Sequence, residues 1–510
     1  MRANIIGTGV AGLVMGAVLA KNGHQVHLYE QNADIGGVTG GFRKNGFSWD
    51  MGQLILEGMG PGEQAGKVID ELGLRERIRL IPADRIYSFP DFEIKPPEEY
   101  RGTWWRKEFF VRQFPDEKRG IERYYRYYRR MMEIITLARL GDKTTGAKGA
   151  FYKAAMYLKL LPLIPKIKWS AGRLMDHYFK GLKIKAALTS ILADFVVKPE
   201  EFQGLGVALV NPEPAFDRRV PLKISRFGRQ PSYTFVDGGC RALVDALAEA
   251  IRSRGGQIHT SCEVTGIRTE NGKVAGIELA DGAFHECDIA VATGGARETF
   301  DGLLKDRELT PEYRKIIDEI PLMESVFMIQ LGVDIDPSKY LDSAVNYYYL
   351  TYDISGSVEK LKSGIYHEGN DGFLICNPTL YSPRLAPEGR YALTIYTVAP
   401  DRVTNYSWAD KKDEMAQKLL DLAQMKIPGL KEHIVEMHIF TPEDFRKLTL
   451  QKHHAFGGCA PVMNKKAAPF RTPVAGFWFI GSQSESGAGI NNVMEGAWRA
   501  ARMILQENMK

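Results

Sequence analysis

The stretch ANIIGTGVAGLVMGAVLAKNGHQVHLYEQ, residues 3–31, decides the fold of this chain. It predicts a buried parallel strand, a tight turn, a helix that ends near Gly23, and a second strand with the sequence QVHLYE. Gly7, Gly9 and Gly12 have the spacing G-x-G-x-x-G at the turn. This order of strand, glycine turn and helix is typical of an α/β fold with a parallel sheet.

The three glycines and Glu30 have separate uses in such a unit. The first glycine permits the tight turn, the second lets the backbone approach a pyrophosphate, and the third lets the helix pack closely on the strand. The amides and the dipole at the start of the helix then face the phosphates. Glu30 ends the second strand, 18 residues after Gly12, where a carboxylate accepts hydrogen bonds from a ribose. The combination predicts a bound dinucleotide, because a glycine turn without a ligand explains neither the spacing nor Glu30.

Composition places the chain among ordinary globular proteins, with an uneven charge. Its 510 residues have room for two or more domains, and 44% of them are hydrophobic and 25% charged. The formal net charge is +5, yet residues 101–190 hold 21 Lys and Arg against 7 Asp and Glu. This asymmetry predicts an anionic partner surface, either membrane or nucleic acid, and the alternative is a solvated helical face.

The cysteines and the apolar runs limit the compartment. Five cysteines are widely separated, without a paired metal-ligand spacing, which favours a reducing, cytoplasmic compartment and no metal site. The apolar N-terminus is similar to a signal peptide, but the glycine spacing accounts for it better. Elsewhere no run of about 18 uncharged apolar residues occurs, so we expect no transmembrane helix.

The segment after Glu30, QNADIGGVTGGFRKNGFSWDMG, contains Gly36, Gly37, Asp50 and Gly52. This pattern resembles the FAD-binding N-terminus of the amine oxidase and phytoene desaturase superfamily. Val38 stands where that superfamily usually has arginine after two glycines.

Three later segments extend the resemblance to the rest of an FAD site. In the superfamily, the strand around Val264 passes the adenine, and the strand of CDIAVATGGA ends in small residues. The segment GFWFIGSQSESGAGINNVMEGAWRAARMI corresponds to the one that places a helix N-terminus under the flavin pyrimidine ring. The resemblance implies FAD contacts at Gly7, Gly9, Val10, Ala11, Gly12, Glu30, Gln31, Gly37, Val38, Thr39, Val264, Thr293, Gly294, Gly481, Ser482, Gly489, Ile490 and Asn491.

Further stretches, among them SPRLAPEGRYALTIYTVAP, resemble phytoene desaturases, carotenoid isomerases and retinol saturases over nearly the full chain. That resemblance implies flavin chemistry on carbon–carbon bonds of a long lipophilic polyene: desaturation, saturation or isomerisation. Two alternatives remain, an amine oxidase-like flavoenzyme and a prenyl-lipid-binding protein of the GDP-dissociation-inhibitor type. The electron partner stays open between oxygen, a quinone and another protein. QGLGVAL, at residues 203–209, lacks the third glycine and the acid of a tight NAD(P) site.

Three side chains are candidates for proton transfer. His453 and His454 are adjacent, so in a strand they point to opposite faces and at most one faces the site. Glu485 precedes the second glycine turn. The alternative for all three is an ordinary solvated or hydrogen-bonded side chain.

We predict an α/β architecture with a discontinuous, Rossmann-like FAD-binding domain over residues 1–75, 230–300 and 460–510. A mixed α+β substrate domain fills the gaps, largely helical over 76–229 and an antiparallel sheet over 301–459. In RGIERYYRYYRRMMEIITLARL the tyrosines follow the helical period. We therefore interpret its basic–aromatic composition as helix packing and expect no nucleic acid.

The stretch AFYKAAMYLKLLPLIPKIKWS, residues 150–170, is both basic and apolar. It is too short and too charged to span a bilayer, and its two prolines break a spanning helix. We expect a peripheral docking surface on the inner face of the membrane. One alternative is that Leu158, Leu161 and Ile164 pack into the core. The predicted membrane contacts are Lys153, Tyr157, Lys159, Leu160, Leu163, Lys166, Lys168 and Trp169.

Overall fold

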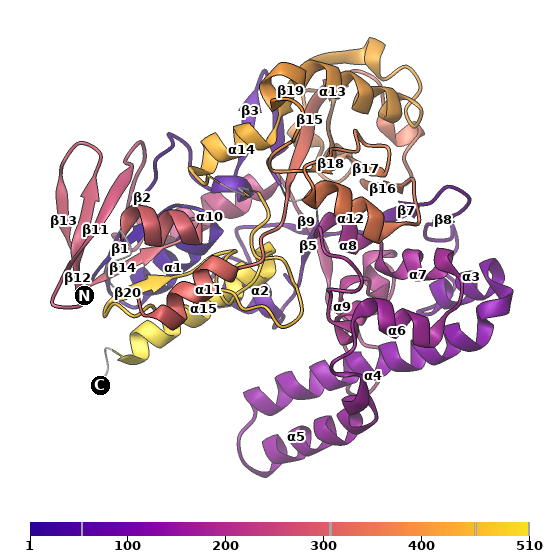
Figure 1. Cartoon of the computed structure of the whole chain (residues 1–510), viewed down its shortest axis with the longest axis horizontal. Helices are drawn as coiled ribbons and strands as arrows, with labels where there is room; N and C mark the ends of the chain where they lie inside the picture. Colours follow the sequence, from indigo (N-terminus) through magenta and orange to yellow (C-terminus); the bar gives the residue numbers. More distant parts are fainter. Residues whose placement is uncertain (53–54, 305–308, 453, 455, 508–510) are drawn as a thin grey trace.

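A five-stranded parallel sheet forms the centre of the half of the molecule that carries the glycine motif. The computed structural model describes residues 1–52, 55–304, 309–452, 454 and 456–507 (Figure 1). The strand order is β10-β2-β1-β14-β20, and every neighbouring pair is parallel. The strands are β1 (Arg2–Ile6), β2 (Gln25–Tyr29), β10 (Gln257–His259), β14 (Ile289–Ala292) and β20 (Phe477–Phe479).

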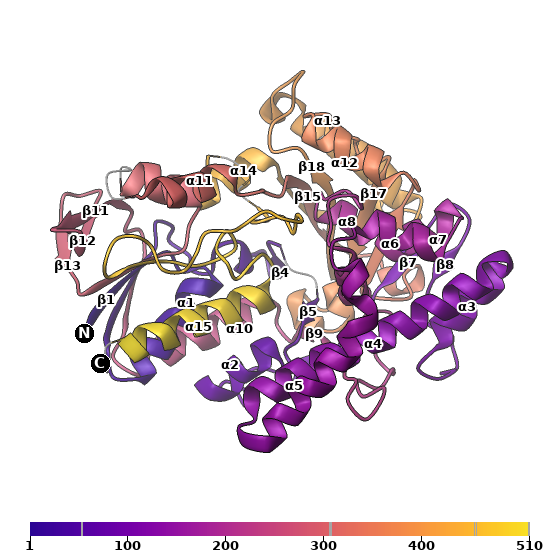
Figure 2. The same ribbon diagram turned by 60° about the horizontal axis from the view of Figure 1, so that its bottom comes forward.

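Helices cover one face of this sheet and an antiparallel meander covers the other. The last helix of the chain packs against the first, so the C-terminal segment returns to the N-terminal unit (Figure 2). The discontinuous, Rossmann-like fold predicted from the sequence is therefore confirmed. The helices are α1 (Val10–Lys21), α2 (Gln64–Leu72), α10 (Cys240–Arg252) and α15 (Ile490–Glu507), and the meander is β11 (Val264–Glu270), β12 (Lys273–Leu279) and β13 (Phe284–Glu286).

A seven-stranded sheet organises the second half, in the order β19-β15-β18-β17-β16-β7-β8. Its pairs are antiparallel except β16 with β7. The antiparallel sheet expected between residues 301 and 459 is present, while β7 and β8 come from the stretch expected to be largely helical. The strands are β7 (Ile86–Ser88), β8 (Glu93–Ile94), β15 (Ser325–Val333), β16 (Val345–Tyr349), β17 (Gly372–Cys376), β18 (Tyr391–Ala399) and β19 (Ile434–Phe440).

The two faces of this sheet meet different partners. One face packs against α13 (Trp408–Gln424) around a buried hydrophobic cluster of aliphatic and aromatic side chains. The opposite face turns toward the glycine-motif half, because Tyr396 and Met328 pack there with Met51 and Val38. The remaining smaller elements are β3 (Gly41–Lys44), β4 (Phe47–Asp50), β5 (Leu56–Glu57), β6 (Leu80–Pro82), β9 (Tyr233–Val236), α11 (Pro311–Glu319), α12 (Ile354–Lys362) and α14 (Pro442–Thr449).

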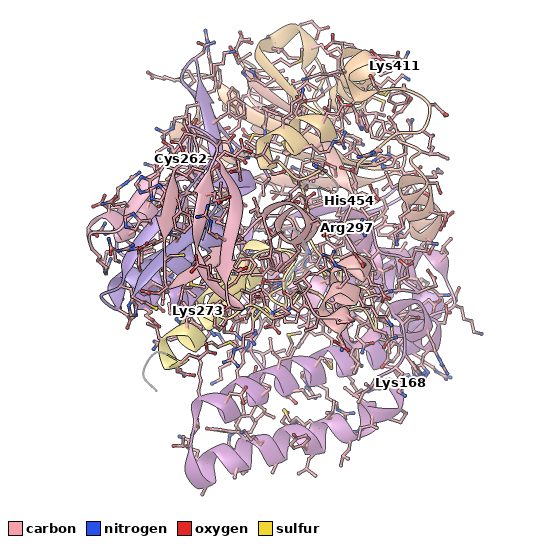
Figure 3. All side chains as sticks on the ribbon, turned by 60° about the vertical axis from the view of Figure 1, so that its left-hand side comes forward. Lys168, Cys262, Lys273, Arg297, Lys411 and His454 are labelled. Carbon is pink, nitrogen blue, oxygen red and sulfur yellow. The ribbon has the colours of Figure 1, made fainter. Side chains whose placement is uncertain are left out.

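A helical layer with a projecting hairpin completes the second half. The tyrosine face of α4 is buried as predicted, with Tyr124 and Tyr128 no more than 1% exposed. α4 and α5 run side by side and extend beyond the rest of the ribbon (Figures 1 to 3). The helices are α3 (Trp105–Gln113), α4 (Lys118–Lys143), α5 (Gly146–Leu160), α6 (Ala171–Tyr178), α7 (Leu182–Thr189), α8 (Ile191–Asp194) and α9 (Val207–Val210).

The stretch from 150 to 170 forms most of α5 and the 3-10 turn Leu161–Lys166. The side chains that this stretch exposes and those that it buries differ from the prediction. Leu158, Leu161 and Ile164 are 69%, 55% and 50% exposed, so the alternative that they pack into the core is wrong. Leu163 is 3% exposed, so its expected contact with lipid is wrong as well. The cause is that α5 packs mainly on α4 and touches Phe227 through Phe151 and Tyr152, and the turn after α5 points Leu163 back into the helical core.

The other predicted membrane contacts divide into exposed and half-buried side chains. Lys153, Lys168 and Tyr157 are exposed. The remaining four are half-buried: Leu160 and Trp169 pack against the helical core, Lys159 pairs with Glu133 at 2.7 Å, and Lys166 donates to the Tyr178 hydroxyl at 3.3 Å. Among the described residues, no helix combines the length and the apolar character that crossing a bilayer requires.

Candidate active site

Gly7 and Gly12 form the tight turn after β1, where only glycine fits. Gly7 has a φ of +97°, in the left-handed region, and a Cβ atom there would lie 2.4 Å from Oγ1 of Thr293. At Gly12 a Cβ would lie 2.1 Å from the carbonyl oxygen of Gly7. Both contacts are too close for real atoms, so both positions exclude a side chain. The turn and the close helix–strand contact predicted from the spacing are therefore present.

Gly9 differs from the other two glycines because the space beside it is open. A Cβ at Gly9 would meet no heavy atom within 4 Å, and its φ of −57° suits any residue. Gly9 is also the N-cap of α1, which has no side-chain cap and no acidic residue in its first turn. The first-turn amides of Val10, Ala11 and Gly12 and the positive end of the helix dipole therefore face open space. Such a helix start binds a pyrophosphate.

Glu30 lies at the same edge of the sheet, directly after β2, and is 5% exposed. Its Oε2 accepts hydrogen bonds from the Thr8 amide at 3.0 Å and the Thr8 hydroxyl at 2.5 Å. Its Oε1 accepts from the Asn32 amide at 3.0 Å and side chain at 2.9 Å. These bonds hold the carboxylate beside the glycine turn. Gln31 differs, because its side chain donates to the carbonyl of Leu448 at 2.9 Å and so joins α14.

The second glycine loop, Gly37–Thr39, lies against the first glycine turn. Gly36 forms an isolated parallel bridge with Gly9. The loop is a single 3-10 turn whose last residue is buried, and Val38 packs with Met51 on the side that faces the seven-stranded sheet. The structure therefore brings these three predicted contacts to the glycine turn.

The C-terminal segment reaches this edge too. The Thr293 hydroxyl donates to the carbonyl of Ile6 at 2.8 Å, and the Ile480 amide donates to the carbonyl of Ala292 at 2.9 Å. The carboxyl ends of β1, β14 and β20 therefore meet. The predicted contacts that follow these ends are Thr293, Gly294, Gly481 and Ser482, and Gly489, Ile490 and Asn491 lie at the start of α15.

Val264 approaches the same edge from the antiparallel meander. It is the first residue of β11 and packs in one cluster with Tyr29, the last residue of β2. Two residues earlier, the amide of Cys262 donates to the carbonyl of Glu30 at 2.8 Å. Val264 therefore lies on the Glu30 side of the glycine turn.

Comparison with known proteins agrees with this geometry. The family model described as "Flavin containing amine oxidoreductase" matches residues 10–505. The chain belongs to this family. It is an FAD-dependent oxidoreductase, as the sequence predicted.

Individual relatives of the flavoenzyme are distant. The chain is 24% identical over 508 residues to prolycopene isomerase 1 from an Oncidium hybrid cultivar, covering 95% of this chain and 80% of that protein. It is 22% identical over 528 residues to a 4,4'-diapophytoene desaturase from Methylomonas sp, covering 99% and 95%. A crystal structure of an oxidoreductase from Methanosarcina mazei has a TM-score of 0.63 at 18% identity, covering 98% of this chain and 100% of that one. This likeness shows the fold.

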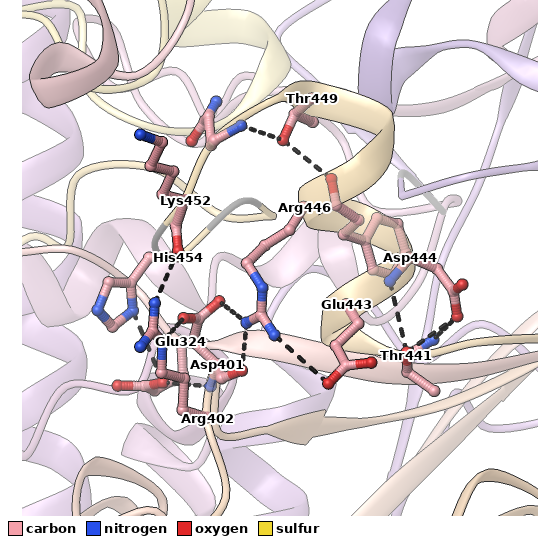
Figure 4. Close-up of polar contacts among 12 residues, drawn as sticks. Glu324, Asp401, Arg402, Thr441, Glu443, Asp444, Arg446, Thr449, Lys452 and His454 are labelled. Carbon is pink, nitrogen blue, oxygen red and sulfur yellow. Dashed lines mark hydrogen bonds and ion pairs between the residues drawn. The ribbon is translucent and has the colours of Figure 1, made fainter. Parts of the chain in front are cut away.

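His454 lies in a loop of the flavoenzyme, with a φ of +49°. The expectation of a strand there is wrong, and His453 is outside the described residues. The Nδ1 of His454 is 3.6 Å from Oε2 of Glu324 (Figure 4). Burial raises the pKa of Glu324, and the positive charge of His454 opposes the rise. The pair can hold one proton, and Asp401 fixes it by donating its amide to Glu324 at 2.7 Å.

The loop that carries His454 reaches the cofactor edge a few residues later. A Cβ at Gly52 would lie 3.2 Å from the ring of Phe456, and one at Gly458 would lie 2.5 Å from the Cβ of Ser482. Glu485 has a different setting, because it is exposed and its Oε1 accepts the amide of Phe470 at 3.1 Å. That bond ties two surface loops together.

Asp50, from the DMG motif, lines a cavity of about 260 Å³ between the β3–β4 hairpin and α10. Its Oδ1 accepts the amide of Cys240, the first residue of α10, at 2.8 Å. Burial raises the pKa of Asp50 to about 7, although this hydrogen bond lowers it. We interpret Asp50 as the cap of α10.

Sequence reasoning missed the aromatic wall of the seven-stranded sheet. Tyr396 joins the cluster of Val38 and Met51 to a second cluster that contains Tyr347. Beyond Tyr347 lies Arg85, a buried residue just before β7. The available signal was the period of two in Arg85-x-Tyr87 and Tyr347-x-Tyr349, which predicts one shared face within each strand. It does not predict which strands become neighbours.

Proposed function

We propose that this flavoenzyme acts on the carbon–carbon bonds of a long lipophilic polyene, as a desaturase, saturase or isomerase. The observation that carries the proposal is the wall beside the second glycine loop. Tyr396 packs there against Val38 and Met51, and the next cluster along the sheet adds Ile55 and Tyr347. Such a wall binds an apolar chain and offers no nucleophile. The names of the isomerase and desaturase relatives support the same substrate class.

We assign the cofactor to the edge where the glycine turns meet. FAD supplies the hydride chemistry that a hydrocarbon chain needs and that side chains lack. The amides from Gly9 to Gly12 would hold its pyrophosphate, since the space beside Gly9 is open. Glu30 would meet the ribose, and the start of α15 at Ile490 would meet the flavin ring. A helix N-terminus in that place stabilises negative charge on the ring.

The chain's own side chains would exclude water and supply a proton. Met51 and Met328 are at most 7% exposed, so the wall keeps the reacting carbons dry. His454 and Glu324 form a pair that can exchange a proton, and His454 lies two residues before Phe456. We keep His454 as the candidate acid or base, with Glu324 as the residue that positions it.

Oxidation of an amine is the second candidate, because the family is named for it and tyrosine faces attract ammonium groups. Arg85 argues against it. Its guanidinium carbon lies 5.0 Å from the ring centroid of Tyr87 and 5.9 Å from that of Tyr347. A cation of the protein therefore already lies at these rings and would repel a second one.

We also propose that α5 docks the enzyme on an anionic membrane, where such a substrate dissolves. The apolar ridge, defined as Tyr157, Leu158, Leu161 and Ile164, is at least 50% exposed at each residue. Residues 146–168 contain no Asp or Glu, and Lys148, Lys153 and Lys168 are exposed beside the ridge. An apolar ridge flanked by lysines suits a bilayer surface with anionic headgroups.

Anaerobic flavin spectroscopy tests the reaction. The oxidised and the photoreduced holoenzyme are mixed separately with phytoene, lycopene and putrescine, and the polyenes are then separated by chromatography. We expect a polyene to bleach the oxidised flavin, to restore the reduced flavin, or to leave as a different isomer. Putrescine should change neither form. Bleaching by putrescine, with every polyene unchanged, would contradict the proposal.

A further inference from the structure

Arg85 is a buried cation without an acidic partner. The residue is 8% exposed, and its guanidinium lies among the rings of Tyr87, Phe216, Tyr233 and Tyr347 at 5.0 to 5.9 Å from their centroids. Within the described residues, no carboxylate lies within 4.0 Å of it, and its Nε has no hydrogen-bond partner. One Nη donates to the Val210 carbonyl at 2.9 Å and to the Asn211 side chain at 3.0 Å.

A second buried arginine, which also donates to Asn211, shows the usual arrangement. Arg106 is 1% exposed, and its Nη2 pairs with Oε1 of Glu213 at 2.7 Å. Taking a charge out of water is costly unless a partner compensates it. Arg106 meets this requirement within the protein, whereas Arg85 leaves a charge and a hydrogen-bond donor unused. The unused groups point to a partner from outside the chain.

A row of aromatic rings leads from the cofactor edge to Arg85. Tyr396 is the first ring of the row. It packs in one hydrophobic cluster with Val38 and in a second cluster with Tyr347. The ring centroids of Tyr347 and Tyr87 are 5.2 Å apart, and Arg85 lies over both rings. Tyr396 packs toward the glycine-motif half, whereas Tyr87 and Tyr347 pack with the buried cluster of the helical layer. A chain-like substrate that starts at the flavin and follows this row of rings would end at Arg85.

Two carboxyl groups flank the end of the row, and burial reduces their charge. Burial raises the pKa of Asp194 to about 7, although hydrogen bonding from Tyr349 and the charge of Arg85 lower it. Burial also raises the pKa of Glu57, which accepts the Tyr233 hydroxyl at 3.0 Å. Asp194, Tyr347 and Tyr396 line a cavity of about 40 Å³ along the row. Burial therefore weakens the negative charge on both carboxyl groups beside Arg85.

We propose that Arg85 binds a carboxylate at the far end of the polyene, so that the substrate is a polyene acid rather than a pure hydrocarbon. A guanidinium presents parallel N–H groups that match the two oxygens of a carboxylate. The unpartnered Nε provides one of these donors. A hydrocarbon end would leave the charge uncompensated, and an ammonium end would be repelled. This inference rests on the proposed polyene chemistry and names its substrate class.

Ligand binding to the holoenzyme tests the inference. The probes are all-trans-retinoic acid and its methyl ester, which share the polyene and differ in the charged end, and tryptophan fluorescence reports their binding. We expect wild type to bind the acid about tenfold or more tightly than the ester. Arg85→Met should abolish this preference without weakening the ester, and Arg85→Lys should keep part of it. Arg219→Met, which removes a half-exposed guanidinium paired with Asp217 at 2.9 Å, should leave the preference unchanged.

The outcomes separate this inference from the function on which it rests. Equal binding of acid and ester by wild type would overturn the role of Arg85 and leave the polyene chemistry standing. An acid preference that survives Arg85→Met, with bound flavin retained, would overturn it too. Failure of wild type to bind either probe would overturn both. If Arg85→Met does not fold, the comparison of the two probes on wild type and on Arg85→Lys still decides.

Discussion

The cofactor half and the substrate half of this flavoenzyme build their sites from different parts of the chain. At the cofactor edge the backbone forms most of the site: Gly7 and Gly12 exclude side chains, and Gly9 leaves space for a ligand. In the substrate half the site is made of large side chains from separate strands, such as Tyr396 and Tyr347. The first site is defined by where side chains are missing, and the second by which side chains meet. Changes in the two halves should therefore fail in different ways.

Two glycine variants should give the largest effects and separate folding from binding. Gly12→Val adds a branched side chain whose Cβ would lie 2.1 Å from the carbonyl oxygen of Gly7. We therefore expect loss of the fold and of all bound FAD. Gly9→Ala meets no protein atom, so the apoprotein should melt as wild type does while FAD binding is lost. Flavin absorbance and thermal melting measure both properties. A Gly9→Ala protein that retains stoichiometric FAD would break the comparison.

The two buried arginines should differ next most. Arg106→Met leaves the Glu213 carboxylate buried without its partner at 2.7 Å, and we expect a loss of about 3–5 kcal/mol in the free energy of unfolding. Arg85→Met breaks no ion pair and should cost about 1–2 kcal/mol. Urea unfolding of the two variants measures the difference. Equal losses would mean that Arg85 is as fully compensated within the chain as Arg106.

The apolar ridge of α5 should have a smaller effect, confined to membrane binding. Leu158→Ser, Leu161→Ser and Ile164→Ser, made together, should reduce flotation with phosphatidylglycerol vesicles about tenfold or more. Higher salt should weaken wild-type binding to these vesicles, because the neighbouring lysines contribute.

A matched triple variant controls for the loss of exposed apolar surface. Leu182→Ser, Ile365→Ser and Met425→Ser change side chains that are 59%, 52% and 67% exposed elsewhere on the substrate half. These positions should leave flotation unchanged. An equal loss in both triple variants would show that binding does not depend on α5.

The pH dependence of stability should show the smallest effect. The pKa of Asp194 is about 7 in the folded protein against 3.8 for the free side chain. The contribution of Asp194 to the free energy of unfolding therefore falls as the pH rises from 4 to 7, and it is constant above that range. We expect Asp194→Asn to gain about 1–2 kcal/mol over wild type across this interval in melting experiments.

Asp91 should show the opposite sign. Hydrogen bonding from Lys183 and then from Tyr352 lowers the pKa of this exposed carboxyl. The stabilisation that ionised Asp91 gives the folded protein is complete above the pKa of the free side chain. It is lost as the pH falls through the lower pKa of the folded protein. Asp91→Asn should therefore be less stable than wild type near neutral pH and approach it in acid. The same sign for both variants would exclude our assignment of the Asp194 shift to burial.

The cofactor half could be predicted from the sequence because its signals are local. The spacing of Gly7, Gly9 and Gly12 and the position of Glu30 all lie within one strand–helix–strand unit. The buried tyrosine face of α4 followed from its helical period. The orientation of α5 did not, because an amphipathic pattern with apolar residues on several faces does not say which face meets α4. For this reason Leu163 was assigned to the wrong side, and Leu158 was placed in the core under the alternative interpretation.

The substrate site could not be predicted because it depends on strand order. Arg85 precedes β7, which pairs in parallel with β16 from a region more than 250 residues away. Neither segment carries a motif, and each strand alone looks like ordinary core. The burial of Arg85 without an acid, and its contact with Tyr347, exist only once the sheet has formed. The position of His454 could not be predicted either, because tertiary contacts define the loop that carries it.

Product analysis tests the central claim most directly. The holoenzyme is incubated with a polyene in phosphatidylglycerol vesicles, beside the same protein stripped of FAD and the stripped protein reloaded with FAD, and the extracts are analysed by chromatography and mass spectrometry. We predict that only the FAD-loaded samples change the polyene, either by the mass of two hydrogens or by isomer at constant mass. An unchanged polyene in every sample, or the same change without FAD, would contradict this account.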